Sequence, residues 1–115
     1  MPIPELELRR VSTLLAELCE KGSPEHLRDQ LYLEFVVEDN AITLSEKRTG
    51  YGATQGIWLD TPVARFRYSP SKGTWALFCM HRDLKWHRYR PLGPRKTFKL
   101  LLREVDEDPT GIFWG

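Results

Sequence analysis

Apolar residues recur with two different periods along this chain, and the places where the period changes divide it into three parts. Over Pro4–Glu20 they lie three or four residues apart, as on one face of an amphipathic helix. From Leu31 they alternate with polar residues, as in a half-buried β-strand. After Pro94 the helical spacing returns, at Phe98, Leu101, Leu102 and Val105. The sequence therefore predicts a helix at each end and a β-sheet in the middle.

Short turns divide the middle part into four or five strands. Asp39-Asn40 suits a two-residue hairpin turn because both residue types tolerate positive φ, and Ser69–Gly73 suits a longer turn. We expect strands at residues 31–38, 41–47, 62–68 and 74–80, and a short fifth strand at 84–89. Strands joined by short turns pair with their neighbours. The predicted fold class is therefore α+β: an N-terminal helix, a short second helix ending at Gln30, an antiparallel meander of four to five strands, and a C-terminal helix packed on one sheet face.

Two segments follow neither period. Residues 48–61 contain Gly50, Gly52 and Gly56, and we expect a long irregular loop there. The chain ends with the apolar pair Phe113-Trp114, which favours docking on the core over a tail that extends into water.

Length and composition indicate a single cytoplasmic domain over residues 1–115. A chain of 115 residues with 41% hydrophobic residues can form one core without metals or disulfides. It has no run of about 18 apolar residues, so we expect no membrane partner. Met1–Glu7 lacks the basic and apolar regions of a secretory signal. Cys19 and Cys79 lie far apart within apolar patterns, and we interpret both as small buried hydrophobic residues.

Charge is unevenly distributed, although the formal net charge is only +1. Residues 61–103 contain 11 Lys and Arg but a single acid, Asp83, whereas the segments on either side are acidic. Such asymmetry favours an anionic partner. The alternative is that the acidic segments fold against the basic one and neutralise it.

The basic segment also carries aromatic residues. If its first hairpin sets Tyr68 opposite Thr74 and its second turns tightly at Arg82-Asp83, the outer face presents Arg65, Arg67, Trp75, Trp86 and Arg88, with Arg90 at the end. The core face then gathers Ala64, Phe66, Tyr68, Ala76, Phe78 and Met80. A shift of one residue in the second turn instead exposes Lys85, His87 and Tyr89. The candidate site residues are therefore Arg65, Arg67, Trp75, Lys85, Trp86, His87, Arg88 and Arg90.

Three interpretations of this face stay open. Aromatic rings that stack on bases, beside arginines that bind phosphates, predict a site for single-stranded or structured nucleic acid. A structural interpretation pairs Arg67 with Trp75 and Arg88 with Trp86 as a cation–π ladder that covers the sheet. The same residue types are common at protein interfaces, so a protein-interaction module or a homodimer, joined through Phe113-Trp114 or an open sheet edge, is the alternative function.

The sequence contains no pattern for catalysis or for a cofactor. Cys79, His81 and His87 are the nearest candidates for a metal site, but they lack the spacing of a zinc signature. The glycines of residues 50–56 do not form a dinucleotide-binding fingerprint. We therefore expect no cofactor and no metal, and no feature favours an enzyme.

Four strings carry a resemblance to a known family: residues 26–30 (HLRDQ), 62–68 (PVARFRY), 82–89 (RDLKWHRY) and 104–115 (EVDEDPTGIFWG). Together they resemble the bacterial family labelled domain of unknown function 3024, over nearly the whole chain. The resemblance implies a small stand-alone bacterial protein and brings no catalytic or binding residues with it.

Overall fold

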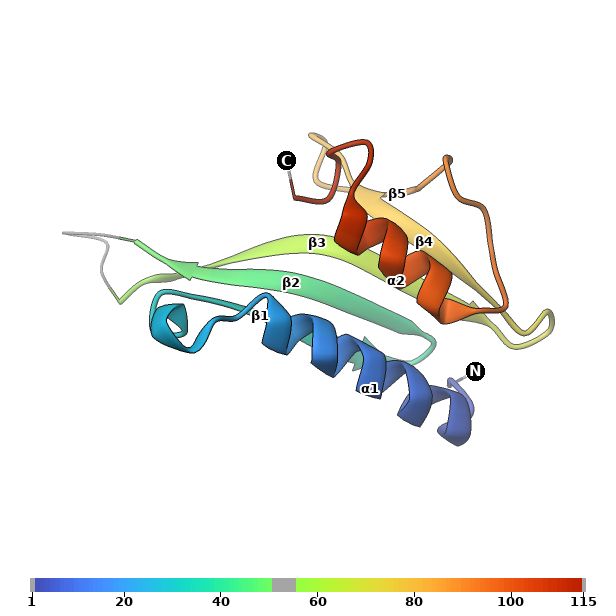
Figure 1. Ribbon diagram of the computed structural model, residues 1–115. Helices are drawn as coiled ribbons and strands as arrows, with labels where there is room; N and C mark the ends of the chain where they lie inside the picture. The colour runs from blue at the N-terminus through green and yellow to red at the C-terminus, as the bar shows by residue number, and fades with distance from the viewer. Residues whose placement is uncertain (1, 51–55, 115) are drawn as a thin grey trace.

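In the computed structural model, two helices lie on one face of a five-stranded antiparallel sheet (Figure 1). The structure describes residues 2–50 and 56–114. In chain order the elements are α1 (Glu5–Lys21), the 3-10 turn η1 (Glu25–Leu27), β1 (Leu31–Glu38), β2 (Ala41–Thr49), β3 (Trp58–Ser69), β4 (Thr74–Met80), β5 (Trp86–Arg88) and α2 (Phe98–Glu107). The strands follow one another in the sheet in the order β1-β2-β3-β4-β5. The predicted α+β meander is therefore confirmed.

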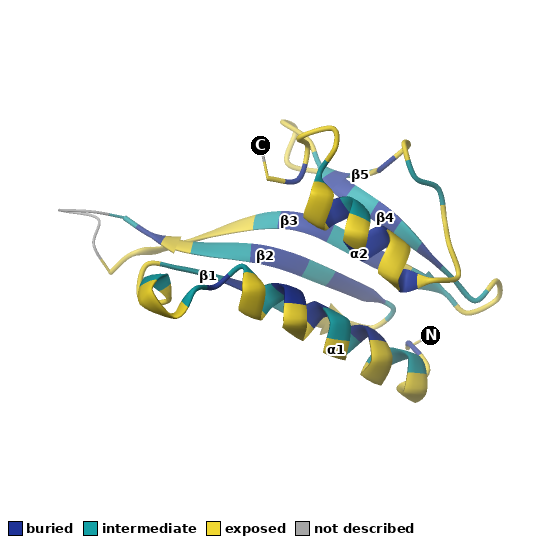
Figure 2. Ribbon diagram, viewed as in Figure 1, coloured by how far each residue is buried: buried dark blue, intermediate teal, exposed yellow. Residues whose placement is uncertain are grey.

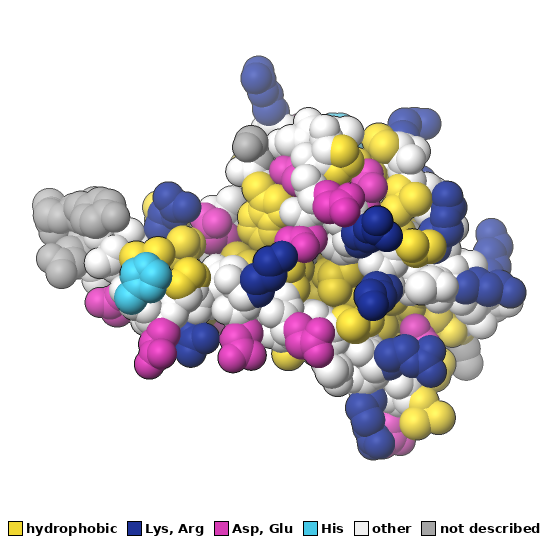
Figure 3. Space-filling view, viewed as in Figure 1, with side chains coloured by type: hydrophobic (Ala, Val, Ile, Leu, Met, Phe, Trp, Pro, Cys, Tyr) yellow, Lys and Arg dark blue, Asp and Glu magenta, His cyan; other side chains and the backbone are white. Residues whose placement is uncertain are grey.

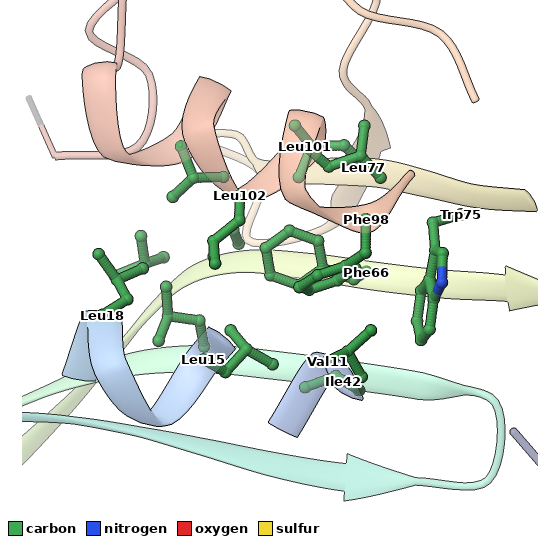
Figure 4. Packing of buried hydrophobic residues seen from close by; sticks show 14 of the residues in the cluster. Val11, Leu15, Leu18, Ile42, Phe66, Trp75, Leu77, Phe98, Leu101 and Leu102 are labelled. Atoms are coloured by element: carbon green, nitrogen blue, oxygen red, sulfur yellow. The ribbon is translucent and has the colours of Figure 1, made fainter. Parts of the chain in front are cut away.

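The core lies between the helices and the inner face of the sheet (Figure 4). Val11, Leu15 and Leu18 form the buried stripe of α1, at the helical spacing seen in the sequence. The stripe of α2 is also buried, and its Phe98 ring packs 4.8 Å from Phe66, centroid to centroid. These contacts fix both helices on the same face and leave the opposite face, here called the outer face, without a helix (Figure 1).

The C-terminal segment docks on the core, as predicted. Phe113 is buried, and the indole nitrogen of Trp114 donates to the carbonyl of Val105 at 2.7 Å. Asp108 ends α2 in the left-handed conformation, and its carboxylate accepts the backbone N–H groups of Phe113 and Trp114. α2 begins at Phe98 and not near Pro94, because Arg95 forms two backbone hydrogen bonds with Trp75 and stays extended.

The hairpin of β2 and β3 is longer than predicted. Trp58–Thr61, assigned to a loop by the nearby glycines, continues β3 and pairs with β2 up to Thr49. Gly52, one of those glycines, lies outside the described residues. β4 pairs only with Ala64–Ser69, so Trp58–Pro62 of β3, here called the arm, extends beyond the helices, and its residues Trp58–Thr61 are exposed (Figure 2). The sequence does not show the alternation of apolar and polar residues that is typical of a strand here, because Ile57, Trp58 and Leu59 are all apolar.

The predicted register of the β3–β4 hairpin is wrong by one residue. Ser69, not Tyr68, lies opposite Thr74. The four residues between them close the turn with Gly73 at φ +63° and a hydrogen bond from its N–H to Ser69. A shift of one residue exchanges the two faces of a strand. Trp75 therefore faces the core, and the residues expected there, Ala76, Phe78 and Met80, lie on the outer face.

The β4–β5 connection also differs from the tight turn expected. Met80 pairs with Trp86 and Phe78 pairs with Arg88, so five residues lie between the strands. Leu84 in this connection adopts φ +62°. Trp86 and Arg88 thereby share the outer face with Phe78, whereas Tyr89 is buried. None of the helices among the described residues is long and apolar enough to cross a membrane.

Candidate nucleic-acid interface

Five side chains from three adjacent strands form one cluster on the outer face, here called the outer basic patch. They are Arg65 and Arg67 of β3, Phe78 of β4, and Trp86 and Arg88 of β5. Directly paired residues of an antiparallel sheet project on the same side. Arg65, Phe78 and Arg88 therefore stand in one row across the strands, because Phe78 pairs with both arginines.

The arginines of the patch pack on its aromatic rings. The guanidinium carbons of Arg67 and Arg88 lie 5.5 and 5.6 Å from the centroid of the Phe78 ring. The guanidinium of Arg65 lies 5.9 Å from the Trp86 ring. These distances are in the range of cation–π contacts, which orient a guanidinium without removing its charge. The patch therefore presents positive charge and partly exposed rings side by side.

No acid neutralises these arginines within the residues that the structure describes. The lysine and arginine of the sheet that form ion pairs there are Lys47 and Arg48, and the three patch arginines form none. The Nε atom of Arg65 is buried and has no hydrogen-bond acceptor in the same described part of the chain. Packing, and not an ion pair, thus holds Arg65 in place, and its charge stays available to a ligand.

The acids of α1 lie on the other side of the sheet. Glu5 pairs with Arg9, and Glu7 pairs with Arg10 and also accepts the indole N–H of Trp75. On this helix-bearing face acidic and basic side chains are interspersed (Figure 3). These ion pairs join residues of α1 to one another, so the acids of α1 do not neutralise the outer basic patch.

Where β1, β2 and the first residues of β3 form the outer face, acidic side chains outnumber basic ones around Lys47. Lys47 donates to Asp60 at 2.8 Å and lies 3.2 Å from Glu34, so two acids surround one base. The hydrogen bonds to Asp60 and Glu34 raise the pKa of Lys47. The positive part of the outer face is therefore limited to β3, β4 and β5.

A comparison with models of known protein families assigns the chain to one of them. The model of the family described as Domain of unknown function (DUF3024) matches residues 3–115. The chain is a member of the DUF3024 family. None of the curated proteins and none of the solved structures matches it. In this DUF3024 chain, two of the strings that suggested the resemblance, residues 62–68 and 82–89, supply four residues of the patch: Arg65, Arg67, Trp86 and Arg88.

The structure brings together four of the residues selected from the sequence, and the other four are not part of this cluster. Arg65, Arg67, Trp86 and Arg88 form the outer basic patch, and Lys85 is exposed in the turn before Trp86. Arg90 is exposed beyond the end of β5. The prediction that Trp75 is exposed is wrong: its side chain is 0% exposed and its ring lies 5.0 Å from Phe98.

Phe78 is the residue that the sequence reasoning missed. The apolar pattern of β4 covers both of its faces, and the assumed register placed Phe78 in the core. The cation–π ladder expected on Trp75 is instead formed on Phe78, and Arg65 takes the place of Arg88 over Trp86. The signal that identifies Phe78 is the length of the 70–73 turn, which sets the register.

His87 belongs to a separate cluster on the opposite side of β5. Its ring stacks on His81 with centroids 4.0 Å apart, and its Nε2 lies 2.8 Å from Asp83. His81 is 3.5 Å from the Cys79 thiol, whose pKa is raised because burial disfavours the thiolate. Cys79, His81 and His87 border a pocket of about 480 Å³. In the described part of the chain, no three His, Cys, Asp or Glu side chains are arranged to hold a metal ion.

Proposed function

We propose that this protein binds single-stranded nucleic acid through the outer basic patch. The observation that carries the proposal is the row of Arg65, Phe78 and Arg88, in which a partly exposed ring stands between arginines that no described acid neutralises. Bases stack on aromatic rings, and guanidinium groups bind phosphates. In the cytoplasm, the location expected from the sequence, RNA is an abundant partner for such a face.

The shape of the face favours a single strand over a duplex. The outer face is an open sheet without a covering helix (Figure 1). Unstacked bases can lie flat on such a surface, whereas a duplex hides the faces of its bases. In this proposal Phe78 and Trp86 stack on bases, and Arg65, Arg67 and Arg88 contact the backbone. Lys85 and Arg90, exposed nearby, add to the attraction at longer range.

The proposal is tested by titrating the purified protein with short single-stranded oligonucleotides, followed by tryptophan fluorescence. Trp86 lies in the patch, and its fluorescence is expected to be quenched when an oligonucleotide binds. Arg67→Ala combined with Arg88→Ala is expected to weaken binding by at least about tenfold. The same double variant is expected to reduce the slope of log K against log salt by about 1.4, or about 0.7 for each phosphate that is no longer neutralised. Phe78→Ala is expected to cost about 1–3 kcal/mol of binding free energy, the contribution of one stacked base.

A matched control removes the same charge from the other side of the molecule. Lys96 and Lys99 are exposed and lie just before and within α2. Lys96→Ala combined with Lys99→Ala is expected to leave affinity within about threefold of wild type, because only long-range attraction is removed. Equal weakening by both double variants would contradict a site on the outer face. Absence of saturable binding at low salt would contradict nucleic-acid binding altogether.

A further inference from the structure

The arm of β3 has a free edge. Trp58–Pro62 pairs with β2 on one side, and no strand among the described residues lies on the other, because β4 begins its pairing at Ala64. Along this edge Ile57, Trp58 and Leu59 are 57%, 43% and 61% exposed. An exposed apolar edge strand is a template for pairing with another chain.

The hydrogen bonding of β2 shows which backbone groups point outward. The N–H of Thr49 donates to Gln30, on the β1 side, at 2.9 Å. Thr49 and its partner Trp58 therefore form a pair that exchanges no hydrogen bonds, because the backbone groups of a strand residue point to one neighbour only. The N–H and C=O of Trp58, and with the period of two those of Asp60, face the open side. Pro62, next in this series, has no N–H and ends the edge.

We propose that a second copy of the chain pairs with this edge in antiparallel fashion, with the two-fold axis at Leu59. Trp58 of each copy then exchanges two backbone hydrogen bonds with Asp60 of the other, which satisfies four donors that otherwise face water. Leu59 lies opposite Leu59 of the second copy, and Ile57 lies opposite Thr61. The proposal concerns self-association and does not depend on nucleic-acid binding.

Charge and hydrogen bonding select this register over its neighbours. Centring the axis on Asp60 sets two carboxylates directly opposite each other, which is destabilising. Centring it on Trp58 requires the N–H of Gly56, which already donates to the hydroxyl of Thr49 at 3.0 Å. With the axis at Leu59, Asp60 lies opposite Trp58 and keeps its ion pair with Lys47 at 2.8 Å.

The contact between the two copies is small, and it fixes how their sheets are oriented. Residues 57–61 of each copy form the contact, which is well below a standard interface, so we expect a dissociation constant on the order of micromolar. The two sheets become one, and the outer faces of both copies lie on the same side because the axis is perpendicular to the sheet. Two outer basic patches then share one surface.

Sedimentation velocity over a wide range of protein concentrations, without nucleic acid, tests the proposal. The wild-type protein is expected to shift from monomer to dimer as its concentration rises. Leu59→Asp sets two carboxylates at the axis and is expected to weaken the dimer by at least about tenfold. Leu6→Asp is the matched control, because Leu6 is 74% exposed on α1, away from the arm. A monomer at every concentration, or a dimer equally sensitive to both variants, would overturn the proposal.

A cross-linking experiment tests the register. Leu59→Cys places two thiols opposite each other at the axis, and mild oxidation is expected to give a covalent dimer. Ile57→Cys, on the same edge, is expected to remain largely monomeric because Ile57 lies opposite Thr61. Wild-type protein, which contains Cys19 and Cys79, gives the background. Faster cross-linking of Ile57→Cys than of Leu59→Cys would overturn the axis at Leu59.

Discussion

At the scale of single residues, Trp75 and Trp86 have opposite environments although both lie in the basic, aromatic segment. Trp75 packs against Tyr68 and Phe98, with ring centroids 5.1 and 5.0 Å away, and its indole N–H donates to Glu7. Trp86 lies on the outer face beneath Arg65. One tryptophan joins the sheet to both helices, and the other is part of the outer basic patch.

This difference predicts different effects on stability. Trp75→Ala is expected to lower the free energy of unfolding by about 3–5 kcal/mol, because it opens a cavity among fully buried side chains. Trp86→Ala is expected to cost clearly less, because its ring is partly exposed. Chemical denaturation followed by circular dichroism measures both. Equal effects of the two substitutions would contradict the register in which Thr74 lies opposite Ser69.

Tyr89 is a buried residue whose ionisation is linked to folding. Its side chain is 1% exposed, and its hydroxyl donates to Glu104 at 2.6 Å. Burial, and secondly the hydrogen bond to Glu104, raise the pKa of Tyr89 above that of an ordinary tyrosine. The contribution of Tyr89 to the free energy of unfolding is therefore fully present below the pKa of a tyrosine in the unfolded chain, about 10. It is lost as the pH rises through the higher pKa that Tyr89 has in the folded protein.

The stability difference between wild type and Tyr89→Phe is accordingly expected to depend on pH. At pH 8 the variant is expected to be less stable by about 1–2 kcal/mol, because the acceptor on Glu104 loses its partner. Above about pH 10 the difference is expected to shrink, since only the wild type must keep a phenol protonated to fold. Urea denaturation of both proteins at about pH 8 and about pH 10.5 measures it. A difference that stays constant would contradict this linkage.

At the scale of elements, the side chain of Asp108 links the end of α2 to the C-terminal segment. The carboxylate of Asp108 accepts backbone hydrogen bonds from Phe113 at 3.1 Å and from Trp114 at 2.9 Å. Asp108 also has φ +46°, which aspartate tolerates better than most residues. The acidic end of α2, unfavourable for the helix dipole, is therefore used to turn the chain and hold the tail.

Asp108→Ala is expected to destabilise the protein by about 2 kcal/mol, because two backbone N–H groups no longer have a charged acceptor. Asp106→Ala, two residues earlier, removes only an exposed ion pair with Lys21 and is expected to cost less than about 1 kcal/mol. Denaturation monitored by tryptophan fluorescence compares the two. Similar destabilisation in both variants would contradict a specific role for Asp108.

At the scale of the whole molecule, the sheet separates two kinds of surface. The helix-bearing face carries mixed charges that pair with one another, whereas the outer face has a basic half over β3, β4 and β5. The arm of β3 extends the sheet beyond the helices (Figure 1). A protein of this shape offers a binding face and an edge for self-association at separate places.

The sequence by itself determined the elements whose signals are local. The stripes of α1 and α2, the alternation in β1 and the Asp39-Asn40 turn each depend on residues close together in the chain, and all four are present in the structure. Glu38 lies opposite Ala41, so the turn has two residues, and the first of them, Asp39, has a positive φ of 54°. From these signals the order of helices and strands follows without knowledge of the core.

Only the tertiary structure decided the faces and registers of the later strands. β4 is apolar on both faces, so its pattern does not say whether Trp75 or Phe78 points inward. The choice depends on whether the turn is one residue longer or shorter, because a register shift of one residue exchanges the two faces of a strand. The packing of Trp75 against Phe98 and its hydrogen bond to Glu7 fix it, and both partners come from distant helices. The composition of the outer basic patch therefore follows from long-range packing.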